Sequence, residues 1–292
     1  MPAADSRQRS DDRIVAPLGR RACEVTDNRE AGGYRIFTAI DAIGPEPRAG
    51  QFYMLAAVEG WGACSGRPYL PRAFSVAEAE VTDDGVRLDF LVEDVGPGTQ
   101  RLAALREGEE LWVTGPLGRP FSHPRDLKSD AAGAILVGGG IGLAPLAILR
   151  RQLAERGVPI RTLLGFRDRE HSGGVEELFG CCEVRLASED GHVGHRGYVT
   201  ELLAVLLEGD ATASAAVYAC GPPAMLETVR ALCLEREVAA ELAMETPMAC
   251  GFGACMGCAV PLADGGYMRL CTDGPVVDAA EIETALVRGS GH

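Results

Sequence analysis

Residues 134–146, which read AILVGGGIGLAPL, place an apolar strand, a run of glycines and the beginning of a helix in direct succession. Glycines at such a turn let the backbone approach a phosphate group at the N-terminus of the helix. The spacing differs from the G-x-G-x-x-G of a plain Rossmann site, so a tight turn without a ligand stays open as the alternative. The candidate nucleotide ligands in this turn are Gly138, Gly139, Gly140, Gly142 and Pro145.

The residues around this turn could be mistaken for a membrane helix, because residues 131–149 carry no charged side chain. The glycines and Pro145 would break a spanning helix into pieces too short for a ~30 Å hydrocarbon core. Residues 1–19 are polar and charged and lack the apolar centre of an export signal, so we expect a flexible tail. We therefore expect a cytoplasmic protein whose ten cysteines do not form a disulfide framework.

The pattern on both sides of the turn predicts three modules and a β plus α/β fold. Within residues 130–240, apolar strands alternate with helical patterns, which indicates a parallel sheet. Within residues 20–122, short amphipathic strands are separated by Gly-Pro and Asp-Gly turns, which indicates an antiparallel barrel or sandwich. Residues 241–292 concentrate cysteines and glycines and predict a small loop-rich module. The α/β module is expected to have strands at 134–137, 162–165 and 215–219 and helices at 143–156, 200–207 and 224–235.

The charge balance argues against one class of function. The 292 residues include 28 Lys+Arg and 42 Asp+Glu, which gives a formal net charge of −14. A nucleic-acid-binding protein needs a basic face to neutralise phosphates. We therefore expect no nucleic-acid partner, and the lack of an export or membrane segment leads us to expect no membrane partner.

The strongest chemical signal is a C-x4-C-x2-C-x12-C pattern formed by Cys250, Cys255, Cys258 and Cys271. This spacing matches the thiolate ligands of a plant-type [2Fe–2S] cluster. Gly251, Gly253 and Gly257 leave room for backbone N–H groups to point at the sulfurs. The alternative is a structural zinc site with four cysteine ligands. Such sites usually show paired knuckles, however, and Cys271 has no cysteine close to it in sequence.

A [2Fe–2S] cluster carries one electron at a time whereas nicotinamide transfers a hydride, so a chain that holds both needs a flavin between them. Residues 72–75 (RAFS) offer an arginine that can clamp a phosphate and a serine that can bond a flavin edge. Residues 96–99 (GPGT) can hold the same pyrophosphate at a helix N-terminus. Residues 220–222 again follow a strand and open a helix, which adds Gly221 and Pro222 as candidate cofactor ligands. Each piece alone is a common turn, and their order along the chain favours a reductase.

This order of motifs resembles the ferredoxin–NADP reductase superfamily with a C-terminal cluster module. More closely, it resembles the electron-transfer subunits of type-B dihydroorotate dehydrogenases. Residues 249–258 (ACGFGACMGC), 270–276 (LCTDGPV) and 189–200 (EDGHVGHRGYVT) carry the resemblance, which covers about residues 20–278. It implies FAD in the barrel, NAD(H) on the parallel sheet and a [2Fe–2S] cluster. The residues that it implies at the FAD are Arg72, Ala73, Phe74, Ser75, Leu91, Val92, Glu93, Gly98 and Thr99.

Further expectations concern Cys220, Asp168, the histidines and the remaining cysteines. The resemblance implies that Cys220 lies near the nicotinamide and acts in catalysis, and the alternative is a small buried core thiol. Asp168 favours the free ribose hydroxyl of NAD, and the arginines on both sides of it favour the phosphate of NADP, so only the resemblance favours NAD. The histidines form no constellation with carboxylates. The cysteines that we expect to be core or surface thiols are Cys23, Cys64, Cys181, Cys182 and Cys233.

The resemblance also implies a partner. Oxidation of dihydroorotate would need an FMN-bearing barrel of ~250 residues, and three modules already occupy this chain. We therefore expect a separate FMN-containing catalytic subunit, in a heterotetramer, that contacts this chain near the cluster. Electrons would pass from its FMN through the cluster and FAD to NAD+, in pyrimidine synthesis. The alternatives are a reductase subunit of a ferredoxin-dependent NAD(P) transhydrogenase or a hydrogenase, and a redox-silent interaction subunit stabilised by zinc.

Overall fold

The computed structural model describes residues 19–62, 68–180, 183–209 and 214–287. The expected tail, apart from Gly19, lies outside these residues, as do Cys64, Cys181 and Cys182. The barrel strands are β1 (Arg21–Ala31), β2 (Tyr34–Asp41), β3 (Phe52–Ala57), β4 (Arg72–Thr82), β5 (Gly85–Val92) and β6 (Glu110–Leu117), and the short helix α1 (Pro97–Ala103) lies beside them. The short helix α2 (Pro124–Leu127) follows the barrel and contacts the central sheet. The elements of the central sheet are β7 (Gly133–Gly139), α3 (Leu143–Glu155), β8 (Ile160–Phe166), α4 (Gly174–Phe179), β9 (Val184–Ser188), β10 (His195–Arg196), α5 (Val199–Leu207), β11 (Ala215–Cys220), α6 (Pro223–Glu235) and β12 (Ala240–Ala243). The last elements are β13 (Ala259–Pro261), β14 (Tyr267–Arg269), α7 (Leu270–Asp273) and β15 (Val276–Asp278).

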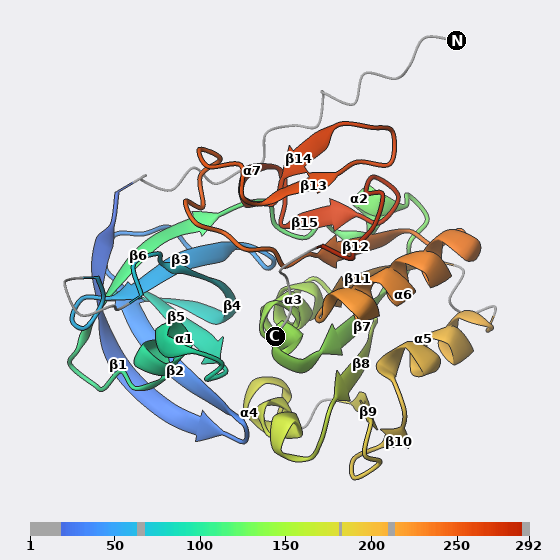
Figure 1. The fold of residues 1–292 in the computed structure, drawn as a ribbon. Helices are drawn as coiled ribbons and strands as arrows, with labels where there is room; N and C mark the ends of the chain where they lie inside the picture. Colours follow the sequence, from blue (N-terminus) through green and yellow to red (C-terminus); the bar gives the residue numbers. More distant parts are fainter. Residues whose placement is uncertain (1–18, 63–67, 181–182, 210–213, 288–292) are drawn as a thin grey trace.

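The six N-terminal strands form a closed antiparallel barrel in the order β1-β2-β5-β4-β3-β6 (Figure 1). This confirms the barrel predicted from the alternating strands. Alternation places one face of each strand inside, as in β1, where Cys23 and Val25 are buried between exposed neighbours. The strand β3 differs because both of its faces are buried: Tyr53 and Leu55 fill the barrel, and Phe52 and Met54 belong to the second core of the protein.

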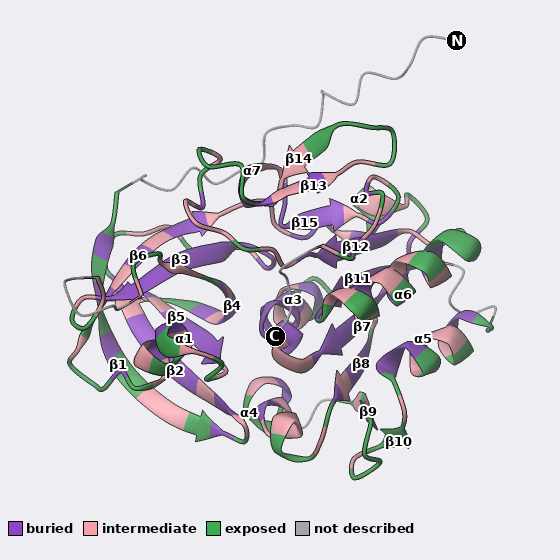
Figure 2. Cartoon of the chain, in the orientation of Figure 1, coloured by how far each residue is buried: buried purple, intermediate pink, exposed green. Residues whose placement is uncertain are grey.

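The central sheet has the order β10-β9-β8-β7-β11-β12-β15, and it is parallel except for β15, which pairs antiparallel with β12. This confirms the predicted α/β module. The helix α3 lies between the sheet and the barrel, and α5 and α6 cover the other face (Figure 1). Most of α3 is buried, whereas α5 and α6 expose their outer surfaces (Figure 2). The uncharged stretch at 131–149 is therefore a buried strand, a turn and a helix that is covered on both sides.

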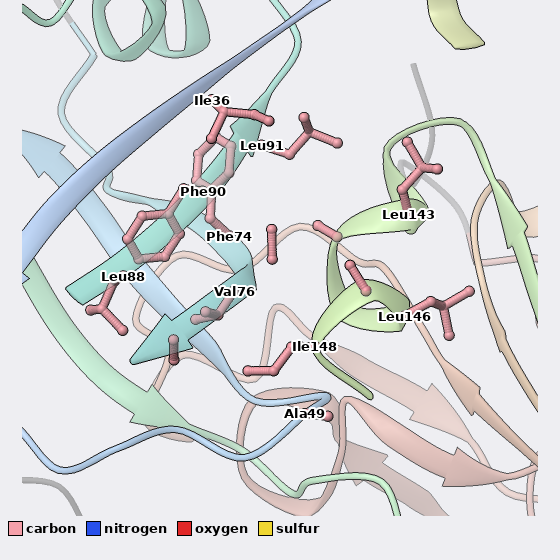
Figure 3. Close-up of a cluster of buried hydrophobic side chains, with 14 of the residues drawn as sticks. Ile36, Ala49, Phe74, Val76, Leu88, Phe90, Leu91, Leu143, Leu146 and Ile148 are labelled. Atoms are coloured by element: carbon pink, nitrogen blue, oxygen red, sulfur yellow. The ribbon is translucent and has the colours of Figure 1, made fainter. Parts of the chain in front are cut away.

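The contact between the barrel and α3 is apolar at its centre and polar at its edge. Figure 3 shows Ile148 of α3 directed at barrel residues that include Val76, whereas Leu146 points away from the barrel and packs against the sheet near Gly138. At the edge, Arg151 contacts Glu78 with 2.7 Å between Nε and Oε1, and it also donates to the carbonyl of Ala79 at 2.9 Å. The barrel and the sheet are thus packed through one continuous core.

The C-terminal residues combine a two-stranded sheet, β13–β14, with a strand that joins the central sheet. The strand β12 spans residues 240–243 and pairs with β15, so the central sheet includes strands from both sides of the boundary expected at 240. The bounds of the three modules stay a prediction. Within the described residues, no helix combines the length and the apolar character needed to cross a membrane.

Candidate functional site

A cavity of about 540 Å³ lies where the three modules meet. The barrel contributes residues of β3, β4, β5 and α1, and the central sheet contributes the beginning of α3 and the end of β11. The segment that leads to the cysteines contributes residues 244–249. The predicted site residues that line the cavity are Arg72, Ala73, Phe74, Ser75, Leu91, Glu93, Thr99, Pro145 and Cys220. The wall of this cavity therefore brings together predicted site residues that are separated by up to about 150 residues in sequence.

On the barrel side, Arg72 lies against the first turn of α1. A Cβ atom at Gly98 would lie 2.7 Å from Nε of Arg72, so only glycine leaves room for the guanidinium there. Arg72 also donates to the carbonyl of Leu70 at 2.7 Å and lies 5.8 Å from the ring centre of Trp61. Thr99 accepts a hydrogen bond from the backbone N–H of Val95 at 2.9 Å and thereby shapes the same turn. A guanidinium beside a helix N-terminus is an arrangement that suits a phosphate group.

The two glycine turns meet at the carboxyl edge of the sheet, where parallel α/β sheets bind their ligands. The end of β11 is in register with β7, with Cys220 opposite Gly138. A Cβ atom at Gly142 would overlap the carbonyl oxygen of Cys220, and one at Gly139 would lie 2.6 Å from the sulfur of Met225. Glycine is therefore required at position 142, where the contact is with backbone atoms. Among the described residues, the cavity wall includes Ile141, Ala144 and Pro145 of the first turn but none of its glycines, and it includes neither Gly221 nor Pro222.

Cys220 lies at the cavity with almost all of its surface buried. Burial raises the pKa of its thiol well above the ordinary value, and the nearby carboxylate of Glu245 raises it further. A thiol in this environment is protonated at neutral pH and is a poor nucleophile. It can pack against a bound ring, and it remains a candidate for contact with the nicotinamide.

The candidate cluster cysteines lie in two pairs. The sulfurs of Cys258 and Cys271 are 3.2 Å apart, and the backbone N–H of Gly253 donates to Sγ of Cys271 at 3.1 Å. Burial raises the pKa of Cys250. Hydrogen bonds outweigh this effect and lower the pKa to about 6. They come from backbone N–H groups, among which that of Cys255 has the largest effect, and from the side chain of Cys255. Within the described residues, no group of three or more His, Cys, Asp or Glu side chains is placed to hold a metal ion.

The loop that carries these cysteines packs on the barrel. A Cβ atom at Gly251 would lie 2.6 Å from Cγ of Met54 on β3, and Gly251 has a φ of +78°. This contact explains why both faces of β3 are buried. It also holds the cysteine loop next to residues 244–249, which line the cavity.

Comparison with known proteins identifies the family. Residues 245–283 match the family model of the iron–sulfur cluster binding domain of dihydroorotate dehydrogenase B. The electron transfer subunit of dihydroorotate dehydrogenase B (NAD(+)) from Caldanaerobacter subterraneus subsp. tengcongensis is 33% identical over 261 residues, which cover 88% of this chain and 96% of the relative. The corresponding subunit of a Geobacillus species is 38% identical over 217 residues, which cover 74% of this chain and 80% of the relative. This chain belongs to that family of electron-transfer subunits.

Solved structures agree with the fold of this family. A structure of an NADH-dependent reduced ferredoxin–NADP oxidoreductase, described for its flavin-based electron bifurcation, has a TM-score of 0.74 and 25% identity over 90% of each chain. A ferredoxin–NADP+ reductase from Neisseria gonorrhoeae with bound FAD and NADP has a TM-score of 0.60, with 74% of this chain and 91% of that chain covered. At 18% identity, the second match supports the fold alone.

The cysteine loop of this family member fits an iron–sulfur cluster. Backbone N–H groups point at the sulfurs of Cys250 and Cys271, and such hydrogen bonds stabilise and tune cluster thiolates. Cys258 and Cys271 are buried, whereas Cys255 is exposed at the surface. The matching family model describes an iron–sulfur domain, which argues against the alternative of a structural zinc site.

The structure of this electron-transfer subunit homologue also shows residues that the sequence analysis missed. We expected no pairing of histidines with carboxylates, and this was wrong. Nδ1 of His171 lies 2.6 Å from Asp168, and Nε2 lies 3.4 Å from Glu93, which lines the cavity. Hydrogen bonds from His171 lower the pKa of Asp168 to about 2. The i, i+3 spacing of Asp168 and His171 was a signal that could have predicted the pair.

Residues 244–249 were also missed as part of the cavity wall. Met244 and Met248 line the cavity together with Glu245 and Thr246. The sequence feature that could have predicted this role is their position between β12 and the first candidate cluster ligand, Cys250. Cys23 and Cys233 are buried, as expected of core thiols.

Proposed function

We propose that this chain is the electron-transfer subunit of an NAD-dependent dihydroorotate dehydrogenase that serves pyrimidine synthesis. It passes electrons from the FMN of a catalytic partner subunit through a [2Fe–2S] cluster and FAD to NAD+. The observation that carries the proposal is the single cavity whose wall is shared by the barrel, the nucleotide turns and the segment next to the cysteine loop. Membership of the family supports the same activity.

The barrel side of the cavity holds the FAD. Bound FAD exchanges a hydride with nicotinamide and single electrons with an iron–sulfur cluster. Arg72 and the turn at Gly98 and Thr99 bind its pyrophosphate, because a cation and a helix N-terminus converge there. The other residues that we assign to the FAD are Ala73, Phe74, Ser75, Leu91, Val92 and Glu93.

The turns at the carboxyl edge of the sheet hold the NAD(H). Gly138, Gly139, Gly140 and Gly142 form the first turn, and Gly221 and Pro222 form the second. Pro145 and Cys220 line the cavity between this edge and the barrel, where a nicotinamide would face the flavin. Cys220, as a protonated thiol, contacts and orients the ring.

The cluster is bound by Cys250, Cys255, Cys258 and Cys271, and the partner subunit docks over this loop. Phe252 and Met256 lie on the loop and are each 54% exposed. Exposed large apolar side chains are typical of contact surfaces. The complex is a heterotetramer in the cytoplasm.

A second candidate is the reductase subunit of a ferredoxin-dependent transhydrogenase. The fold match at a TM-score of 0.74 to a reduced ferredoxin–NADP oxidoreductase favours it. The higher identity to dihydroorotate dehydrogenase subunits, 33% over 88% of the chain, favours the first candidate.

The decisive experiment is a visible spectrum of the anaerobically purified chain before and after NADH, followed by reconstitution with an FMN-containing dihydroorotate dehydrogenase. We expect flavin and iron–sulfur bands that bleach with NADH, and NAD+ reduction by dihydroorotate only when the partner is added. Bleaching without partner-dependent activity, together with reduction by ferredoxin, would favour the transhydrogenase. A colourless protein that holds zinc would overturn both.

A further inference from the structure

We propose that Arg269 is a positioning residue for the cluster. Its side chain ties the loop of the first three cysteines to the segment that carries Cys271 and places a positive charge at the carbonyl of Gly253, the residue whose N–H bonds Sγ of Cys271. This inference rests on the proposed function, because it requires the [2Fe–2S] cluster at these cysteines.

The chain path places Arg269 between the separated ligands. Twelve residues separate Cys258 from Cys271, and the β13–β14 pairing brings the chain back with Ala259 opposite Arg269. The backbone N–H of Leu270 then donates to the carbonyl of Cys258 at 3.1 Å. Arg269 therefore ends the returning strand and precedes α7, which contains Cys271.

The guanidinium of Arg269 reaches from this segment to the cysteine loop. Its Nη1 donates to the carbonyl of Gly253 at 3.2 Å, and the backbone N–H of Gly253 donates to Sγ of Cys271 at 3.1 Å. Both polar groups of Gly253 are thus engaged, one by Arg269 and the other by the sulfur. Arg269 thereby restrains the peptide unit that directly follows the one whose N–H bonds the sulfur.

Asp273 holds Arg269 in place from the far end of α7. Its Oδ2 accepts a hydrogen bond from the backbone N–H of Arg269 at 3.0 Å and lies 3.6 Å from Nε of the same residue. The side chain of Arg269 is 40% exposed, so its role does not depend on filling a core.

The position of Arg269 predicts two measurable effects. Outer residues that orient metal ligands typically contribute 10–100-fold to metal retention. The reduction potential of a cluster depends on nearby charge and on hydrogen bonds to its sulfurs. Because reduction adds negative charge to the site, a nearby cation favours the reduced form, and its removal lowers the potential.

The experiment compares the full chain with Arg269→Gln and Arg269→Lys, and uses Arg35→Gln as a matched control. Arg35 on β2 also donates to a backbone carbonyl at 3.2 Å, pairs with a carboxylate at 3.2 Å and is 34% exposed. The measurements are iron content, the rate at which a chelator removes the visible cluster absorption, and the midpoint potential by anaerobic titration. FAD content and far-UV circular dichroism report on the fold.

We expect Arg269→Gln to lose its cluster about 10-fold faster than the wild type and to have a lower midpoint potential, with FAD content unchanged. Arg269→Lys should keep a potential near that of the wild type, because the charge remains, and still lose its cluster faster, because the bond to Gly253 is weakened. Arg35→Gln should match the wild type in both measurements.

The outcomes that would overturn the inference differ in what else they overturn. If Arg269→Gln behaves like Arg35→Gln, the role of Arg269 is wrong and the proposed function stands. If the wild-type chain binds no iron, the proposed function fails and the inference fails with it. Should Arg269→Gln not fold, Asp273→Asn removes the anchoring carboxylate and keeps the cation. A rate of cluster loss equal to that of the wild type in Asp273→Asn would then contradict the proposal.

Discussion

Arg72 and Cys255 belong to different modules, so a change at either residue is expected to affect one cofactor only. Arg72 lies on β4 in the cavity wall, against the first turn of α1. Cys255 lies on the loop before β13 and is exposed, so its substitution leaves the core intact. Substitutions at these two residues therefore test the proposed flavin site and the proposed cluster site independently.

Arg72→Ala is expected to weaken FAD binding about 10–100-fold, because a hydrogen-bonded charge contributes about 1.5–3 kcal/mol. Flavin absorption per chain should fall after dilution and gel filtration, and iron content should stay constant. Arg87→Ala, on the neighbouring strand β5 and paired with Glu80 and Asp89, is the control and should retain its flavin. Full flavin retention in Arg72→Ala would contradict the assignment of Arg72 to the pyrophosphate.

Cys255→Ser should abolish the visible absorption of the cluster and leave the FAD bound, because one of four thiolate ligands is lost. Iron analysis and the visible spectrum of the anaerobic protein test this. Cys233→Ala, which removes a buried thiol of α6, is the control and should keep the cluster. An unchanged cluster in Cys255→Ser would show that the four-ligand assignment is incorrect.

At the scale of single elements, α6 holds the C-terminal segment of the described chain through Glu227. Its carboxylate accepts hydrogen bonds from the hydroxyl of Thr284 at 3.0 Å and from the backbone N–H of Ala285 at 2.6 Å, and it pairs with Arg230 at 2.8 Å. Burial raises the pKa of Glu227, but these three partners lower it by more, so its pKa lies below the ordinary value of 4.5. The charged form is therefore the one that the fold stabilises.

The sign of the pH dependence follows from this lowered pKa. Glu227 contributes its full stabilisation above pH 4.5, and the contribution is lost as the pH falls through its lower pKa in the folded state. Glu227→Gln should reduce the free energy of unfolding by about 1–3 kcal/mol at pH 7. Urea unfolding of both proteins from pH 7 to pH 3 should show the difference shrinking below pH 4.5. A difference that does not vary with pH would rule out the charge as its cause.

At the scale of the whole molecule, α3 joins the barrel to the sheet, and this explains why all of its first seven residues are buried. The core that includes Ile148 also includes Phe74 and Val76 of the barrel (Figure 3). The same core includes Ala216 and Tyr218 of the sheet. A destabilising substitution in α3 should therefore lower the stability of both the barrel and the sheet.

Ile148→Ala is expected to lower the free energy of unfolding by about 2–5 kcal/mol, through lost burial and the cavity that remains. Urea unfolding followed by flavin fluorescence, which reports on the barrel, and by far-UV circular dichroism, which reports on the helices packed on the sheet, should show the two midpoints falling together. Val205→Ala, at a position on α5 that is 67% exposed, should change stability by less than about 0.5 kcal/mol. If only one of the two midpoints falls in Ile148→Ala, the two modules do not share one cooperative core.

The elements were predictable because their signals are local. The helices expected at 143–156, 200–207 and 224–235 are present as α3, α5 and α6 with ends that differ by no more than one residue. The apolar strands and the glycine turns were equally readable, because strand and helix periodicity depends on residues a few positions apart. The pairing of β15 with β12 was not foreseen, because a strand of three residues after a loop carries no periodicity.

The sequence by itself determined the chemistry: the spacing of Cys250, Cys255, Cys258 and Cys271, the glycine turns and the order of the motifs. Only the tertiary structure decided which residues share a wall. It placed residues 244–249 in the cavity, His171 between Asp168 and Glu93, and Arg269 against Gly253. These contacts depend on strand register and on the packing of modules against each other. Neither is encoded in the spacing of residues along one stretch of chain.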